Sequence, residues 1–486
     1  MSDVEVLVIG GGISGLSIAT SLVREGVSVE LWESSGRPGG KIETHADSHG
    51  YIMERAATMV LNFRPEVTRF IEQSNLVAKK SMLAPIVRRY MMHDGKLVTV
   101  PTKLAAMVSS PIWSLAGKLR MLTEPFIRKG GHENETVSEF ISRRVGREVL
   151  ENAMEPYVSG VLASNPDLAN AYSVLPRMTR LERRFGSLTL GIFMHKVLGR
   201  RTATPKETFS FKGGMSTLVE SLVSNPNIRF RSGHTAVEIT KKGSYWRVTG
   251  SAAGTGLSVT ARQVVLSVPA KAAARLLAPH DHDLAGLLRG IQYAPVTVVH
   301  TGFERRSIEH PLDGTGFLIP RRAGVAATGC LWMSSLFPAC APPGRVLLTN
   351  YLGGARRPEV EEWDDERSIA EILRVLTPLL NIRDEPEMVR IDRHREALPL
   401  YHGNYYGRMK QVTNCLQQLP GLHLEANYRG GVSVRDRIVC AQSTAHRIAD
   451  ELAQSVVSEK TYSLNKHPAI SDVDASREFE KSVLTD

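Results

Sequence analysis

A glycine-rich turn near the beginning of the chain has the composition and spacing of a phosphate-binding loop. It contains Gly10, Gly12, Ile13, Ser14 and Gly15. The first glycine of such a turn permits a tight bend, the second lets a pyrophosphate approach the backbone, and the third allows close packing of the following helix. The positive end of that helix then lies at the phosphate. The turn is therefore the first candidate ligand site of the chain.

The elements expected around this turn favour a dinucleotide site. Val4–Ile9 is a run of branched apolar residues, which is typical of a buried parallel strand. A helix is expected directly after the turn, ending near Gly26, and a second strand is expected over Val27–Trp32. Glu33 follows 21 positions after Gly12, where a carboxylate can accept both ribose hydroxyls. Strand, turn, helix, strand and acid thus occur in the order that a dinucleotide site requires.

Directly after this acid, a second glycine-bearing loop carries two cations. We expect its residues Ser34, Arg37, Gly39, Gly40 and Lys41 to contact the cofactor, with both cations beside the pyrophosphate. The loop resembles the one with which members of the flavoprotein amine oxidase superfamily wrap FAD. Enzymes that bind only NAD have little need for such a loop, so FAD is the expected cofactor.

Patterning along the rest of the chain predicts a mixed α/β (α+β) protein. A discontinuous Rossmann-like FAD-binding domain is expected to carry a sheet-based substrate domain and an inserted helical subdomain. The expected boundaries are 1–84, 206–293 and 409–456 for the FAD-binding domain, 85–205 for the helical subdomain, 294–408 for the substrate domain, and 457–486 for a disordered tail. Within the helical subdomain, Leu104–Arg120 and Thr136–Leu150 are amphipathic. Cations interleave with apolar residues in the first stretch, which suits an interfacial helix, although core packing is the preferred interpretation.

Composition limits the partners of the protein. The 486 residues are 42% hydrophobic and carry a net charge of +10, which favours an anionic ligand or an anionic membrane surface. No nucleic acid is expected, because the cations are scattered and lack a recognisable nucleic-acid-binding motif. The sequence begins without an export signal, and no stretch approaches the ~18 to 20 apolar residues of a spanning helix. We expect a cytoplasmic protein; peripheral contact with the cytoplasmic face of a membrane and a homodimer are both left open.

No metal site is expected. None of the four cysteines forms a CxxC pair. His280–Asp283 has metal-ligating residue types, but it follows Pro279 and precedes a predicted helix, so an N-capping turn is the preferred interpretation.

Six further segments, in order and in register, resemble the protoporphyrinogen oxidase family of flavoenzymes. They are Glu155–Gly160, Leu181–Ser187, Gly213–Leu218, Ser334–Pro338, Leu398–Tyr401 and Asn427–Val434. The resemblance implies that Arg89 binds a substrate propionate and that Leu318, Leu331 and Tyr351 sandwich a pyrrole ring. It further implies cofactor contacts from Ala56, Ala57, Thr58, Val237, Asn427, Val432, Ser433 and Val434. No cysteine lies in Asn427–Val434, where covalent relatives tether the ring, so one non-covalent FAD per chain is expected.

The chain departs from this family at three places. Ala56 and Ala426 replace glycines in loops expected to approach the isoalloxazine ring, and Ser164-Asn165 replaces a glycine-aspartate pair. The added methyl groups could reshape the flavin pocket.

The reaction implied by the resemblance is oxidation of a porphyrinogen, either protoporphyrinogen IX or coproporphyrinogen III, to the porphyrin in haem biosynthesis. Flavin N5 accepts a hydride from a weak C–H bond, and three such cycles, each closed by O2, remove six electrons. The sequence identifies no catalytic acid or base. Two alternatives stay open: a desaturase or amine oxidase for another hydrophobic or pyrrolic metabolite, and a non-catalytic flavin-binding paralogue.

Overall fold

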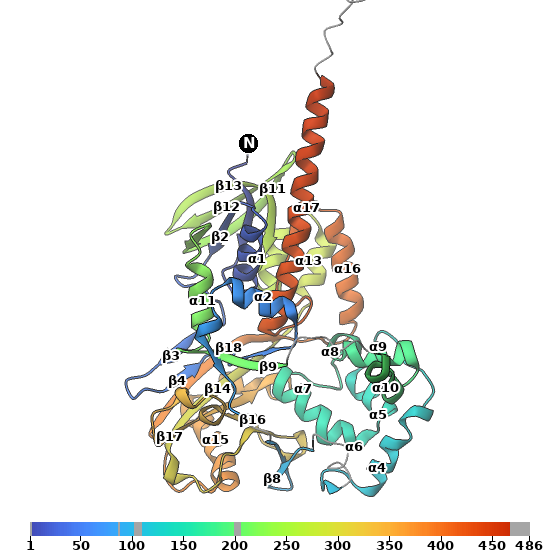
Figure 1. Cartoon of the computed structure of the whole chain (residues 1–486), viewed down its shortest axis with the longest axis vertical. Coiled ribbons are helices and arrows are strands. Elements are labelled where there is room, and N and C mark those ends of the chain that lie inside the picture. The colour runs from blue at the N-terminus through green and yellow to red at the C-terminus, as the bar shows by residue number, and fades with distance from the viewer. Residues whose placement is uncertain (1, 86–87, 102–108, 199–205, 467–486) are drawn as a thin grey trace, which may run out of the picture.

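The computed structural model describes residues 2–85, 88–101, 109–198 and 206–466. One sheet with its covering helices forms the upper half of the molecule in Figure 1, and a second sheet and a group of helices lie side by side below it. The mixed α/β class expected from the sequence is confirmed. No helix among the described residues is both long and apolar enough to cross a membrane.

The first sheet assembles from three separate parts of the chain. Its five parallel strands are, in spatial order, β10 (Ile228–Ser232), β2 (Val29–Glu33), β1 (Val4–Ile9), β13 (Thr255–Leu266) and β19 (Leu422–Leu424). The antiparallel strands β12 (Tyr245–Ala252) and β11 (His234–Lys242) extend from β13. Strand β13 is long enough to pair with β12 in its first part and with β1 and β19 in its last part.

Helices cover both faces of this sheet. The cluster on one face involves α1 (Ile13–Arg24), α2 (Pro65–Gln73), α11 (Ser216–Val223) and α17 (Val434–Lys466). The cluster on the other face involves α12 (Ala270–Leu277), α13 (His282–Arg289) and α16 (Tyr405–Gln417). Asp281 accepts a hydrogen bond from Leu284 N at 2.8 Å, which confirms the capping turn predicted before α13.

The second sheet is mostly antiparallel. Its spatial order is β18 (Met388–Pro399), β14 (Tyr293–Glu304), β17 (Arg345–Gly353), β16 (Ala327–Trp332), β15 (Gly314–Leu318), β7 (Arg88–His93) and β8 (Lys96–Thr99). Helix α15 (Asp365–Leu380) packs on one of its faces.

The position of β7 and β8 corrects the predicted start of the helical subdomain at residue 85. These strands belong to the second sheet, because β7 pairs with β15 and Tyr90 is buried in the core that α15 covers. Tyr90 also donates a hydrogen bond from its hydroxyl to Asp313 at 2.6 Å. Contacts more than 200 positions away in the sequence therefore decided the fold of this segment.

Short strands and helices connect the larger parts. Strands β3 (Thr44–Ala46) and β4 (Ile52–Glu54) form a hairpin, while β5 (Val60–Asn62), β9 (Glu207–Phe211) and β6 (Lys80–Met82) form a three-stranded sheet. The helical subdomain contains α4 (Leu115–Leu122), α5 (Val137–Arg144), α6 (Arg147–Val149), α7 (Glu155–Leu162), α8 (Ala171–Val174), α9 (Pro176–Phe185) and α10 (Leu188–Leu198).

The two amphipathic stretches of the helical subdomain are shorter helices than expected. Residues 104–108 lie outside the described part, and α4 begins only after Pro111, with the Ser114 side chain as its N-cap. Within Thr136–Leu150, Gly146 has a φ of 103° and ends the first helix, because this conformation is incompatible with an α-helix.

The last helix, α17, extends into the segment that was expected to be a disordered tail. α17 continues to Lys466, ten residues into the segment at 457–486 that was expected to be disordered, and residues 467–486 lie outside the described part. A polar segment can also form a helix where it extends beyond the packed core, as the C-terminal end of α17 does in Figure 1.

Candidate functional site

Gly10 and Gly15 of the first turn are required by the packing of the protein itself. Gly10 has a φ of 108°, and a Cβ atom there would lie 2.5 Å from the carbonyl oxygen of Ser267. A Cβ atom on Gly15 would lie 1.9 Å from the carbonyl oxygen of Gly10. At Gly12, in contrast, no protein atom would lie closer than 4.0 Å. The space beside Gly12 is therefore open for a ligand, as the pyrophosphate role of the second glycine requires.

Glu33 is held over this turn. Its Oε2 accepts a hydrogen bond from Gly11 N at 2.7 Å, and its Oε1 accepts from the backbone N–H and the hydroxyl of Ser35, each at 2.8 Å. The residue is 9% exposed. Because β1 and β2 are parallel, the turn and the carboxylate lie at the same edge of the sheet. Helix α1, which begins at Ile13 with Ser14 buried, has no side-chain cap, so its first amides can bind a phosphate.

The second glycine loop packs directly on the first. Gly39 N donates to Gly11 O at 2.8 Å, and Gly40 is so close to Gly12 that an added Cβ would lie 3.1 Å from the Cα atom of Gly12. Arg37 fixes the loop by donating to Gly40 O at 2.7 Å. The predicted loop residue Ser34 is exposed beside Glu33.

Lys41 points away from the two turns. Its Nζ donates to the carbonyl oxygens of Glu396 and Ala397 at the end of β18 and lies 5.6 Å from the ring centroid of Tyr293. Burial lowers the pKa of Lys41 to about 8. Lys41 was expected at the pyrophosphate. Instead it links the loop after β2 to β18 of the second sheet, because the end of β18 offers two carbonyl acceptors.

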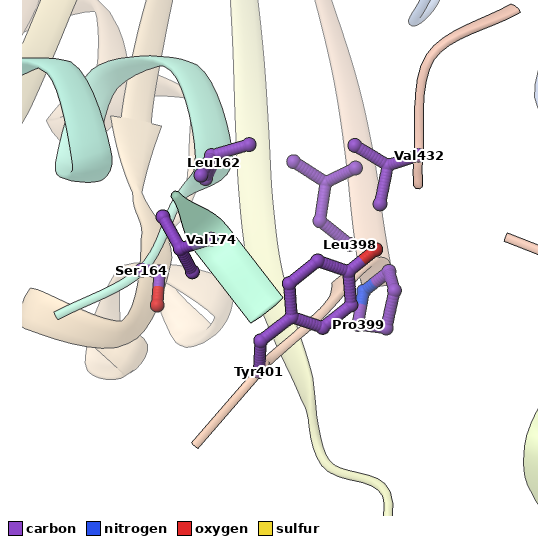
Figure 2. A pocket seen from close by; sticks show the side chains of 7 residues that line it. All are labelled: Leu162, Ser164, Val174, Leu398, Pro399, Tyr401 and Val432. Carbon is purple, nitrogen blue, oxygen red and sulfur yellow. The ribbon is translucent and has the colours of Figure 1, made fainter. Parts of the chain in front are cut away.

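The last loop of the site lies at the same carboxyl edge. Asn427 follows β19, Ser433 accepts a hydrogen bond from Asp436 N at 3.1 Å at the start of α17, and Val434 is buried beside α1. Val432, between them, is half-buried and lines a small cavity with Leu398 (Figure 2).

An ion pair that the sequence analysis did not identify holds this loop. Arg437 Nη1 lies 3.0 Å from Glu425 Oε1 and donates to Ala426 O at 2.6 Å. Both charged side chains are buried. No local signal could have revealed the pair, because the two residues belong to different elements.

The loop after β4 also reaches the boundary between the two sheets. Ala56 and Ala57 are half-buried, Thr58 is buried, and the preceding carbonyl of Arg55 accepts a hydrogen bond from His394 Nε2 of β18 at 2.8 Å. At the far end of the nucleotide region, Val237 lies in an irregular part of β11 and is 66% exposed.

Arg89 and Leu318 lie on one face of the second sheet. Tyr90 pairs in register with Phe317, and both are buried in the core with α15. Because side chains alternate along a strand, Arg89 and Leu318 point to the opposite face. Arg89 is exposed and Leu318 is half-buried there.

Leu331 and Tyr351 lie on the same face. Leu331 follows Cys330, which is buried in the α15 core, and so points away from that core. Tyr351 pairs with Gly329, and Gly329 pairs with Leu318. The register thus brings the four predicted substrate residues together on one face. Gly329, which has no side chain, lies between Tyr351 and Leu318.

This face continues to the nucleotide region. The row of paired residues that runs from Leu318 through Gly329 to Tyr351 continues across the sheet. Tyr351 pairs with Val298 of β14, and Val298 pairs with Asp392 of β18. Asp392 Oδ1 lies 3.7 Å from Arg55 Nε, in the loop that precedes Ala56. The row therefore connects the candidate substrate residues with a loop predicted to approach the flavin.

A polar cluster that no sequence motif indicated surrounds the buried Asp392. His45 Nε2 lies 3.8 Å and His300 Nε2 lies 3.9 Å from its carboxylate, and Arg390 Nε lies 3.1 Å away. Burial lowers the pKa of His300 to about 4, so the imidazole is neutral at pH 7. The members come from β3, β14 and β18, so only the tertiary structure brings them together.

The two neighbouring arginines at the start of β7 differ in their contacts. Arg88 forms an ion pair with Asp313, which also accepts the Tyr90 hydroxyl. Among the described residues, no hydrogen bond or ion pair involves the side chain of Arg89. The Arg89 guanidinium is thus the one of the pair that can bind a ligand.

An open glycine turn and the carboxylate of Glu33, which is expected to bind a ribose, lie at the edge of a parallel sheet. A second sheet presents apolar and cationic residues. This combination is typical of a dinucleotide-dependent oxidoreductase. Residues 13–430 match the Amino_oxidase family, described as flavin containing amine oxidoreductase. The chain belongs to this family, which confirms the superfamily resemblance and a flavin as the cofactor.

Individual relatives align over almost the whole chain. A Bacillus subtilis protein named coproporphyrinogen III oxidase is 30% identical over 89% of this chain and 95% of its own length. An Arabidopsis thaliana protein named protoporphyrinogen oxidase 2, chloroplastic/mitochondrial, is 28% identical over 93% and 95%. The crystal structure of a protein from Exiguobacterium sp. 255-15 covers 93% of this chain and 100% of that one, with a TM-score of 0.77 and 24% identity. The likeness to the Exiguobacterium structure is evidence for the fold alone.

Proposed function

We propose that the protein is an FAD-dependent oxidase that converts a porphyrinogen to the porphyrin in haem biosynthesis, with O2 as the electron acceptor. The observation that carries this proposal is the shared sheet face of Arg89, Leu318, Leu331 and Tyr351, which continues to the nucleotide region. The names of the relatives favour the same substrate class.

Each side chain of the proposed site has a defined task. Glu33 binds the ribose, the amides after Gly12 bind the pyrophosphate, and the apolar residues hold the flat tetrapyrrole and exclude water. Arg89 binds a propionate with its planar guanidinium. The bound flavin supplies hydride-accepting chemistry. Its attachment is proposed to be non-covalent, since the loop from Asn427 to Val434 contains no cysteine.

Anaerobic mixing tests the proposed reaction. Protoporphyrinogen IX or coproporphyrinogen III is expected to bleach the flavin absorption band while porphyrin fluorescence appears in proportion. The two substrates, compared at equal concentration, identify the preferred one. Bleaching by an amine but by neither porphyrinogen would favour an amine oxidase, and a flavin that none of them reduces would indicate a non-catalytic paralogue.

Peripheral membrane contact is a further part of the proposal. Leu115, Leu119 and Leu122 are 55 to 73% exposed on one face of α4, and the adjoining Phe126 is 87% exposed. Leu190, Ile192 and Phe193 of the neighbouring α10 are also exposed. The cations Arg128 and Lys129 are exposed beside Phe126. Cations at the rim of an apolar patch can bind anionic lipid headgroups. A dimer formed through the same patch would instead bring the cations of the two copies close together.

Substitution of Leu122 and Phe126 by serine in one variant is expected to weaken sedimentation with vesicles of anionic phospholipid. Burial of each such side chain contributes about 1.5 to 3 kcal/mol, so loss of two should lower the partition coefficient by roughly a hundredfold or more. Oxidation of a detergent-solubilised substrate should not change. An unaltered partition coefficient, or a dimer that dissociates in the variant, would contradict membrane contact by this patch.

A further inference from the structure

A small cavity lies where the helical subdomain, β18 and the loop before α17 meet (Figure 2). Its apolar lining comes from Leu162, Val174, Leu398, Pro399 and Val432. These residues are contributed by α7, α8, the end of β18 and the loop that follows Asn427. The cavity therefore joins the helical subdomain to the loop proposed to lie at the flavin ring.

The two polar residues of the lining have partners outside the cavity. The hydroxyl of Ser164 lies 3.0 Å from His402 Nε2, and the hydroxyl of Tyr401 donates to the carbonyl oxygen of Asn427 at 3.3 Å. Figure 2 shows the Ser164 oxygen directed away from Leu398 and Val432. A water molecule needs two to four polar partners, and this lining offers few.

The size of the cavity limits its occupant to a very small molecule. The centre of a water-sized molecule can move within about 10 Å³, so the cavity has room for one small molecule. A cavity that is apolar and this small is suited to a diatomic gas or a noble-gas atom, since apolar cavities in proteins stay dry and bind such ligands.

We propose that this cavity is a binding position for molecular oxygen next to the flavin. The inference rests on the proposed function, which makes O2 the electron acceptor, and on the expected contact of Val432 with the flavin. One O2 takes up two electrons and two protons from the reduced flavin and solvent, so the O–O bond is retained and H2O2 leaves. An apolar position beside the ring supplies O2 without competition from water.

Val174 is the residue at which the cavity can be filled with least disturbance of the cofactor. It lies at the end of α8, outside the residues assigned to cofactor or substrate, and its side chain points into the cavity in Figure 2. In Val174→Phe the flavin is reduced with light and a sacrificial donor, without any porphyrinogen, and is then mixed with O2. The second-order rate constant of reoxidation is expected to fall roughly tenfold, equivalent to ~1.4 kcal/mol of barrier.

A matched variant separates this effect from a general disturbance of the helical subdomain. Val161→Phe adds the same volume on α7, next to Leu162, at a side chain that is 49% exposed. It should reoxidise at the wild-type rate, and both variants should keep their flavin content. Equal reoxidation of wild type and Val174→Phe would overturn the proposal, and so would equal slowing by Val161→Phe.

Direct occupancy provides a second measurement if Val174→Phe fails to fold. Crystals of the wild-type holoenzyme under xenon pressure are expected to show an anomalous peak within this lining, and absence of a peak would overturn the proposal. A wild-type reduced flavin that O2 does not oxidise would remove O2 as acceptor as well. If the protein does not oxidise a porphyrinogen, the reoxidation experiment still tests the O2 cavity, because it reduces the flavin with light and uses no porphyrinogen.

Discussion

Replacing Glu33 by alanine is expected to yield a protein that purifies largely without flavin. The carboxylate lies at the end of β2, held by Gly11 N and Ser35, in the position where we propose that it accepts the ribose hydroxyls. Hydrogen bonds to a charged group contribute about 1.5 to 3 kcal/mol each, so loss of two should weaken flavin binding by roughly 10² to 10⁴-fold. The ratio of flavin absorbance, after release by acid, to protein concentration measures the effect.

Two further substitutions separate cofactor binding from folding. Glu33→Gln keeps one acceptor and should retain part of the flavin. Glu30 is equally buried in the same strand but accepts its hydrogen bond from Trp32 Nε1 at 2.8 Å, away from the turn. Glu30→Ala should therefore lower thermal stability without selective loss of flavin. Full flavin occupancy in Glu33→Ala would show that the nucleotide lies elsewhere.

Arg89→Ala is expected to raise the Michaelis constant for a porphyrinogen roughly tenfold or more, because one charge-assisted hydrogen bond contributes ~1.5 to 3 kcal/mol. Flavin content should stay unchanged, since Arg89 is on β7 of the second sheet. Arg89→Lys should restore only part of the affinity, because an ammonium group cannot present the planar fork of a guanidinium. Steady-state kinetics over a range of substrate concentrations separates the Michaelis constant from kcat.

The neighbouring arginine is a matched control. Arg88 is paired with Asp313, so Arg88→Ala should leave the Michaelis constant near the wild-type value. Unaltered kinetics in Arg89→Ala would mean that this guanidinium is only a solvated charge, and the proposed substrate face would be wrong. An equal effect of both substitutions would point to the general positive potential of β7 instead of a specific contact.

The nucleotide unit could be predicted from the sequence because its determinants are local. Val4–Ile9, the turn from Gly10 to Gly15, α1 and Glu33 follow one another within 33 residues, and the spacing of each is set by the geometry of one strand, turn, helix and strand. The capping turn at Asp281 was predictable for the same reason. The family likewise followed from motifs that are read in order along the chain.

Tertiary structure alone decided which distant residues meet. The common face of Arg89, Leu318 and Tyr351 depends on strand register between segments more than 200 residues apart, and a shift by one residue would turn each side chain to the opposite face. The direction of Lys41 and the polar cluster around Asp392 depend on where β18 passes the nucleotide loops. Such contacts are set by packing between elements, which no local pattern encodes.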